Sequence, residues 1–144
     1  MIYVDHTVTI DRPLEEVWDF VSEPANNPQW QSGVELSDPS PSGPIKIGTR
    51  VRIVRKFMGQ RIEVVFETTV FEPNAQFAFK SLSGPLPISG AMAVAATDSG
   101  TEVTYQVTGE AAGVHGLGKS IISSLVNKQI KDDLKALKRL LESI

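Results

Sequence analysis

The chain begins with a segment in which apolar and polar residues alternate. One set of alternate positions is apolar apart from a single histidine and consists of Ile2, Val4, His6, Val8 and Ile10. Neighbouring side chains of a β-strand point to opposite faces, so this alternation predicts a half-buried strand over residues 2–11.

Two short helical segments are predicted next. Pro13 presets the first turn of a helix. Apolar side chains then recur at helical spacing, at Leu14, Val17, Trp18 and Val21. This spacing predicts a short helix that buries Trp18. Pro24 and Pro28 leave room for only a turn or one helical coil before Trp30, which we therefore place on a connector.

Residues 34–110 carry the punctuation of an antiparallel meander of about six strands. Turn residues recur at 38–44, 48, 59, 73–74, 83–85 and 98–100. Parity within each strand predicts these inward-facing side chains: Val51, Ile53, Arg55, Phe57, Ile62, Val64, Phe66, Thr68, Val70, Phe77, Phe79, Ser81, Val103, Tyr105 and Val107.

A long amphipathic helix is predicted from about Leu117 to Glu142. Its apolar stripe consists of Ile121, Ile122, Leu125, Val126, Ile130, Leu134, Leu137, Leu140 and Leu141. Glycines and serines are frequent in its first half, and a strand expected to face it carries Ala91, Ala93, Ala95 and Ala96. We therefore expect the first half of the helix to cover a cavity, with residues 85–88 near its mouth, and the leucine-rich second half to seal the core. The alternative is that the small residues let helix and sheet approach closely and leave no void.

Composition narrows the classes of function. The chain has 144 residues with 41% hydrophobic and 22% charged residues and a formal charge of −3, which suits one domain over residues 1–144 and no nucleic-acid partner. It contains no cysteine, which excludes disulfides and thiolate chemistry, and its two histidines lie far apart, so we expect no metal and no cofactor. The first residues resemble neither a secretion signal nor a membrane span, so we expect a cytoplasmic protein without stable membrane insertion. The oligomeric state stays open.

Several segments resemble a known superfamily over nearly the whole chain. They are TVTIDRPLEEVWDFVSEPANNPQW, PIKIGTRV, VFEPNAQF, SGTEVTYQV and KALKRLLESI. The chain is similar to the SRPBCC (START/helix-grip) superfamily, and within it to the polyketide cyclase/dehydrase and lipid-transport branch. The resemblance implies an α+β helix-grip fold, in which a curved antiparallel sheet of about seven strands surrounds a long C-terminal helix, with two short helices after the first strand. It also implies a central hydrophobic pocket that binds lipids, polyketides or related metabolites.

Polar side chains on otherwise apolar faces are the candidates for chemistry. In a cyclase or dehydratase, His6 would move a proton while Arg55 or Tyr105 stabilised an enolate. The alternatives are a structural strand histidine, a core tyrosine, and an arginine turned outward by a bulge after Ile53. The predicted ligand-binding residues are Trp30, Phe57, Phe66, Thr68, Phe79, Ser81, Tyr105, Ile121 and Leu125.

Two further segments suggest other partners. One hairpin concentrates positive charge at Lys46, Arg50, Arg52, Arg55, Lys56 and Arg61. One interpretation is that this hairpin binds an acidic macromolecule or an acidic membrane surface. The other is that its charged side chains are solvated at a sheet edge and prevent another strand from pairing there. The glycine-rich segment around His115, just before the long helix, is interpreted as a hinge rather than a nucleotide loop.

The leading hypothesis from the sequence is a protein that binds a hydrophobic, lipid-like or polyketide-like molecule in a central cavity. The first alternative is a polyketide cyclase/dehydratase acting in the same cavity. The second is an interaction module that uses the basic hairpin.

Overall fold

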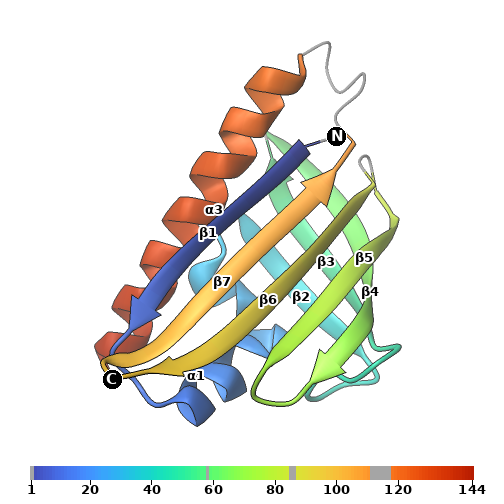
Figure 1. The fold of residues 1–144 in the computed structure, drawn as a ribbon. Helices are drawn as coiled ribbons and strands as arrows, with labels where there is room; N and C mark the ends of the chain where they lie inside the picture. The colour runs from blue at the N-terminus through green and yellow to red at the C-terminus, as the bar shows by residue number, and fades with distance from the viewer. Residues whose placement is uncertain (1, 58, 85–86, 111–117) are drawn as a thin grey trace.

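A computed structural model describes residues 2–57, 59–84, 87–110 and 118–144 of the chain (Figure 1). The elements in chain order are β1 (Ile2–Ile10), α1 (Leu14–Val21), the 3-10 turn η1 (Pro24–Asn26), α2 (Asn27–Trp30), β2 (Val34–Ser40), β3 (Arg50–Phe57), β4 (Gln60–Glu72), β5 (Gln76–Ser83), β6 (Ile88–Thr97), β7 (Gly100–Gly109) and α3 (Lys119–Glu142). The predicted first strand, short helices, meander and long C-terminal helix are all present.

The seven strands form one antiparallel sheet in the order β1-β7-β6-β5-β4-β3-β2. The first strand therefore pairs with the last strand, and the sheet curves so that β2 and β3 lie behind β6 and β7 in Figure 1. Helix α3 runs along β1 on the open side of this curve, and α1 covers one end (Figure 1). The predicted helix-grip fold is confirmed.

Strand β2 extends into a segment that was predicted to be a loop. The sequence places a proline-rich loop at residues 38–44, but β2 continues to Ser40 and includes Pro39. Proline cannot donate a hydrogen bond to a neighbouring strand, which restricts it to sheet edges. Because β2 is an edge strand, Pro39 is tolerated there.

A bulge in β4 changes which side chains face inward. The pairing of β4 with β5 shifts register between Thr68 and Val70, and Val70 is 37% exposed while Thr68 is buried. The predicted inward position of Val70 is therefore wrong, because the extra residue reverses the alternation beyond Thr68. Phe71 packs against the core instead.

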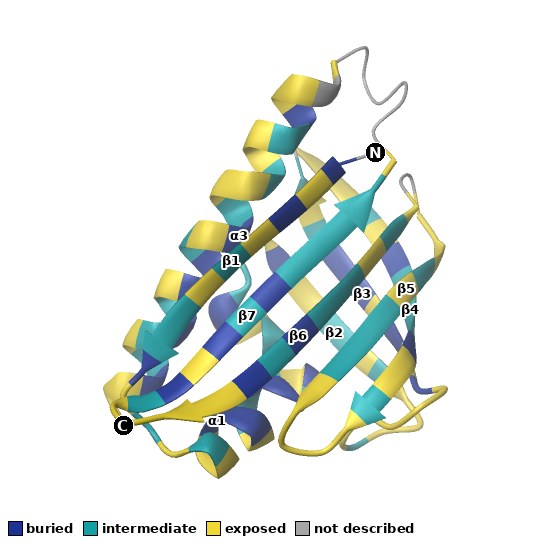
Figure 2. Ribbon diagram, in the orientation of Figure 1, coloured by how far each residue is buried: buried dark blue, intermediate teal, exposed yellow. Residues whose placement is uncertain are grey.

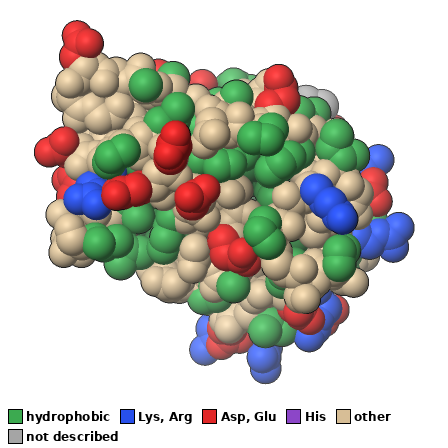
Figure 3. Space-filling model, turned by 90° about the horizontal axis from the view of Figure 1, so that it is seen from below, with side chains coloured by type: hydrophobic (Ala, Val, Ile, Leu, Met, Phe, Trp, Pro, Cys, Tyr) green, Lys and Arg blue, Asp and Glu red, His purple; other side chains and the backbone are tan. Residues whose placement is uncertain are grey.

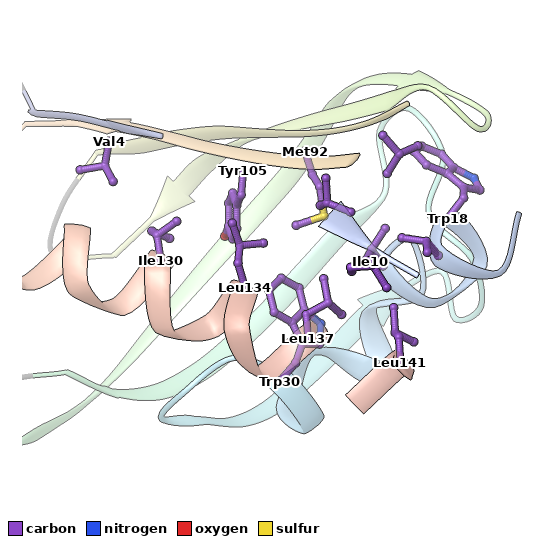
Figure 4. Packing of buried hydrophobic residues seen from close by; sticks show 14 of the residues in the cluster. Val4, Ile10, Trp18, Trp30, Met92, Tyr105, Ile130, Leu134, Leu137 and Leu141 are labelled. Atoms are coloured by element: carbon purple, nitrogen blue, oxygen red, sulfur yellow. The ribbon is translucent and has the colours of Figure 1, made fainter. Parts of the chain in front are cut away.

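The second half of α3 seals the core, as predicted. Leu134, Leu137 and Leu141 are each at most 3% exposed and point from the helix toward the sheet (Figure 4). They meet Ile10 of β1 and the indole of Trp18 of α1 in one cluster of buried residues. Figure 2 shows this buried stripe along the side of α3 that faces the sheet, with exposed residues on the opposite side.

The alanines of β6 do not face the helix. Alternation along the strand buries Met92 and Val94, at 2% and 7% exposure, whereas Ala95 and Ala96 are exposed. The expectation that small residues line the sheet beneath the helix is wrong, because a methionine and a valine occupy the inward positions.

A buried carboxylate joins α3 to the connector between α2 and β2 (residues 31–33). The backbone N–H of Ser32 donates a hydrogen bond of 2.9 Å to Oδ1 of Asp133, which is 2% exposed. Burial raises the pKa of Asp133 from 3.8 to about 6, although the hydrogen bond from Ser32 and the positive charge of Arg55 oppose the rise. The connector is fixed from its other side by the backbone N–H of Lys56, which donates to the carbonyl of Gly33.

None of the helices within the described residues combines the length and the apolar character that crossing a membrane requires.

Truncation of Leu137 tests the seal between α3 and the sheet. Leu137 is fully buried, so Leu137→Ala should lower the free energy of unfolding by about 2 to 5 kcal/mol through lost burial and a residual cavity. Lys135→Ala, two residues away on the exposed side of α3, is the control and should change it by less than about 0.5 kcal/mol. Urea unfolding monitored by circular dichroism measures both, and equal effects would contradict the assigned helix face.

The raised pKa of Asp133 predicts a pH-dependent stability. Between pH 3.8 and about 6 the folded chain binds more protons at this position than the unfolded chain, so its contribution to stability falls as pH rises through this window. Asp133→Asn keeps an oxygen acceptor for Ser32 and removes the charge. We expect the variant to gain about 1 to 3 kcal/mol relative to the wild type between about pH 4 and pH 7. Urea unfolding of both proteins at several pH values measures this difference, and a constant difference would contradict the buried carboxylate.

Candidate functional site

A cavity of about 290 Å³ lies between the first half of α3, the concave face of the sheet and the segment around α2. From α3 its wall includes Ile122, Val126 and Ile130. The predicted cavity under the first half of the helix is therefore present, and the alternative of close helix–sheet contact without a void is wrong. The apolar side chains contributed by the strands are Ile2, Val51, Ile53, Phe57, Ile62, Val64, Phe66, Phe77, Phe79, Ile88, Met92 and Val107.

The cavity opens at the end of the sheet where α3 begins. Exposed or partly exposed lining residues gather there: Gln60 starts β4, Ile88 starts β6 and Glu110 follows β7. Ile88 belongs to the segment 85–88 that was predicted near the mouth, while residues 85 and 86 lie outside the described residues. The polar side chains at this end contrast with the apolar wall deeper inside.

Aromatic rings form a continuous row along one wall. Phe66 and Phe79 meet edge to face with ring centroids 5.1 Å apart, and Phe79 continues to Phe77 at 6.5 Å. Phe77 in turn contacts Trp18 of the core at 5.9 Å. The ring of Phe79 lies where Gly90 on β6 has no side chain, since a Cβ there would lie 2.4 Å from the ring. A glycine on the neighbouring strand thus makes room for this aromatic wall.

Trp30 lies inside the molecule at the end of α2. It is 3% exposed, lines the cavity, and meets the ring of Tyr105 edge to face at 6.1 Å. Figure 4 shows its indole between α3 and the sheet. Pro28 in the first turn of α2 helps to start this one-turn helix, which carries Trp30 inward.

Arg55 faces the cavity from β3. The pairing of β3 with β4 is regular through Arg55, so the alternative that a bulge turns it outward is wrong. Its Nη2 donates a hydrogen bond of 3.0 Å to the carbonyl oxygen of Ser32. Burial lowers the pKa of Arg55, while its interactions with Tyr105 and Asp133 raise it. An arginine keeps its charge despite such a shift, because its ordinary pKa is so high.

Tyr105 places a phenol in the lining of the same cavity from β7. Burial raises the pKa of Tyr105 to about 12, against the positive charge of Arg55, which lowers it. The hydroxyl therefore stays protonated at neutral pH and acts as a hydrogen-bond donor. Arg55 and Tyr105 are thus two hydrogen-bond donors in the lining of a largely apolar cavity.

The predicted ligand-binding residues divide into two groups. Six of them line the cavity, namely Trp30, Phe57, Phe66, Thr68, Phe79 and Tyr105. Ser81 does not: its Oγ accepts a hydrogen bond of 2.9 Å from the backbone N–H of Ile88 across the turn between β5 and β6. The prediction that Ser81 lines the cavity is therefore wrong.

Two helix residues were also placed on the wrong face. Ile121 and Leu125 are 52% and 39% exposed and lie outside the cavity lining, which Ile122 and Val126 form instead. Adjacent residues of a helix differ by about 100° in direction, so a one-residue error moves a side chain from the wall to the surface.

His6, the predicted proton carrier, lies outside the cavity lining. It is on β1, under α3, and its Nε2 hydrogen-bonds Oδ1 of Asn127 at 2.8 Å. The three catalytic candidates are therefore not assembled, because only Arg55 and Tyr105 share the cavity. The structural interpretation of His6 matches this geometry.

The basic hairpin carries acidic partners on its surface. Arg50 pairs with Glu67, Arg52 with Glu63, and Arg61 with Glu35, at distances of 3.6, 3.3 and 3.0 Å. On the face drawn in Figure 3, Lys and Arg side chains likewise stand beside Asp and Glu side chains. These pairs interrupt the expected positive surface. His115, the other candidate segment, lies outside the described residues.

The main residue that the sequence analysis missed is Asp133. It occupies the inward stripe of α3, between Ile130 and Leu137, and an acid at such a position is a signal of a buried polar contact. Its electrostatic influence reaches both Arg55 and Tyr105.

Solved structures with the same fold cover nearly the whole chain. A START superfamily protein from Mycobacterium smegmatis is 16% identical, with 99% of both chains covered and a TM-score of 0.81. TTHA0849 from Thermus thermophilus is 20% identical, with 95% of this chain and 94% of that chain covered and a TM-score of 0.81. DynU16, from the dynemicin biosynthetic locus, is 19% identical and has a TM-score of 0.71, with 99% of this chain and 48% of that chain covered. At these identities the likeness establishes the fold.

Sequence comparison then identifies the family. No curated protein sequence matches the chain significantly. The family described as polyketide cyclase / dehydrase and lipid transport matches residues 1–142. This match spans the curved sheet, the cavity and the long helix that covers it, and the chain belongs to the polyketide cyclase/dehydrase and lipid transport family.

Proposed function

We propose that the protein binds a hydrophobic small molecule, lipid-like or polyketide-like, in the cavity under the first half of α3. The observation that carries this proposal is a space of about 290 Å³, lined mostly by apolar side chains, next to the buried hydrophobic core. Protein interiors rarely contain voids larger than a water molecule. Ligand pockets are concave and mostly apolar, with a few placed polar groups, and volumes start at about 300 Å³.

The row of aromatic rings supports this proposal. Phe66, Phe77 and Phe79 present rigid apolar surface to the cavity, and Trp30 adds an indole that packs against the ring of Tyr105. Large aromatic side chains contribute much contact area for little conformational entropy. A flat or elongated apolar molecule is the occupant that suits such walls.

Catalysis in the same cavity is the second candidate, and the placement of Arg55 and Tyr105 is the observation that favours it. Both groups suit stabilisation of an enolate during cyclisation or dehydration. The predicted proton carrier, His6, contacts Asn127 on α3 rather than the cavity. Binding without chemistry is therefore the better supported proposal, and cyclase or dehydratase activity stays a prediction from the family.

Filling the cavity tests the proposal. Val126→Trp places a large ring inside the space, and we expect it to weaken binding of the neutral fluorophore N-phenyl-1-naphthylamine at least about tenfold, a loss of about 1.4 kcal/mol. Leu125→Trp is the matched control, since it adds the same ring one residue away on the exposed side of α3. Fluorescence titration measures both variants and the wild type.

Three results would contradict the proposal: no binding by the wild type, undiminished binding by Val126→Trp, or equal loss in Leu125→Trp. The last result would indicate attachment to the surface of α3. Native mass spectrometry of the freshly purified protein complements the titration, because a co-purified hydrophobic compound at one molecule per chain would identify the ligand class.

A further inference from the structure

The guanidinium of Arg55 has hydrogen-bonding capacity that the described residues do not use. Nη2 donates to the carbonyl of Ser32, but Nε is buried without a partner. No carboxylate within the described residues forms an ion pair with Arg55. Glutamates pair with these other arginines: Arg12, Arg50, Arg52 and Arg61. The interior arginine therefore differs from these four surface arginines.

Asp133 does not supply the missing partner. Its Oδ1 accepts the N–H of Ser32, whereas Arg55 donates to the carbonyl of the same residue, so the backbone of Ser32 stands between the two charges. Asp133 is absent from the cavity lining, while Arg55 is part of it. The carboxylate thus interacts with Arg55 from outside the cavity, and no described carboxylate of the cavity lining pairs with the guanidinium.

Tyr105 presents a second donor to the same cavity. Its hydroxyl has no hydrogen-bond partner among the described residues, although the residue is 9% exposed and lines the cavity. Both side chains line the same cavity, and the charge of Arg55 opposes the burial-driven rise of the pKa of Tyr105. Arg55 is the only cationic side chain among the described lining residues, and the single acid there, Glu110, is exposed.

We propose that Arg55 and Tyr105 bind an anionic oxygen of the ligand, and that the occupant is an apolar molecule with one carboxylate. This inference rests on the proposed binding function and specifies its ligand. A buried charge without a partner is costly, and an arginine fork matches the geometry of a carboxylate. The ligand's apolar body then lies along the aromatic wall of Phe66 and Phe79.

Displacement of bound N-phenyl-1-naphthylamine by two matched compounds tests this inference. 2-Naphthoate and 2-naphthalenemethanol share the same ring system and differ in the carboxylate. At pH 7 the wild type should bind the acid at least about tenfold more tightly, because a charge-assisted hydrogen bond contributes about that factor. Arg55→Gln should abolish the preference, and Tyr105→Phe, which keeps the ring contact with Trp30, should reduce it.

Arg52→Gln is the matched control for lost charge. Arg52 lies on the same strand with its side chain on the outer face, paired with Glu63, so its replacement should leave the preference for the acid unchanged. If Arg55→Gln fails to fold, the wild type and Tyr105→Phe still decide the question.

The possible failures are distinguishable. Equal displacement by both compounds, displacement by neither, or a preference for the alcohol would overturn the carboxylate site while a bound fluorophore still supported cavity binding. An unchanged preference in Arg55→Gln would overturn the role of that residue. A wild type that binds no fluorophore would overturn the proposed function itself.

Discussion

The rest of the structure depends on the contact between the second half of α3 and the end of the sheet that α1 covers. Leu134, Leu137 and Leu141 bury themselves against Ile10 and the α1 region. Apolar burial of this kind is worth about 1.5 to 3 kcal/mol for each large side chain, enough to fix the axis of a 24-residue helix. Because one half of the helix is fixed in this way, the other half spans the concave sheet without filling the space beneath it. The cavity therefore lies beneath the part of α3 that precedes these buried leucines.

The same helix fixes the polar side of the cavity through Asp133. Ser32 receives a hydrogen bond from Arg55 and donates one to Asp133, so one short connector links α3 to β3. Two buried charges of opposite sign are held near each other without direct contact, which costs less than burying either charge alone. That arrangement holds the charged guanidinium in the cavity lining. The connector at residues 31–33 therefore contributes both to the attachment of α3 and to the position of Arg55 in the cavity lining.

The fold was largely predictable from the sequence because its signals are redundant. Alternation from Ile2 to Ile10, a proline at the helix start and a long apolar stripe each indicate the same architecture, and the family resemblance agrees with them. The site was only partly predictable, because single-residue irregularities decide it. A bulge beyond Thr68 turned Val70 outward, and a one-residue difference in helix direction exchanged Leu125 for Val126. Neither has a clear signature in a local pattern, since each depends on tertiary contacts.

Buried polar groups were the harder part, for a physical reason. A sequence pattern identifies an inward position but does not say which partner a polar side chain finds there, so the strand patterns of His6 and Arg55 did not reveal their different surroundings. In the structure, α3 covers His6 and supplies Asn127 as its partner, whereas no described residue of the helix reaches Arg55 with an ion pair. Solved structures only 16% and 20% identical to the chain share this fold, so most of its side chains can change without changing the fold. Under the proposed binding function, selectivity would come from the polar side chains of the lining rather than from the fold, and Arg55 is the only cationic one among the described lining residues.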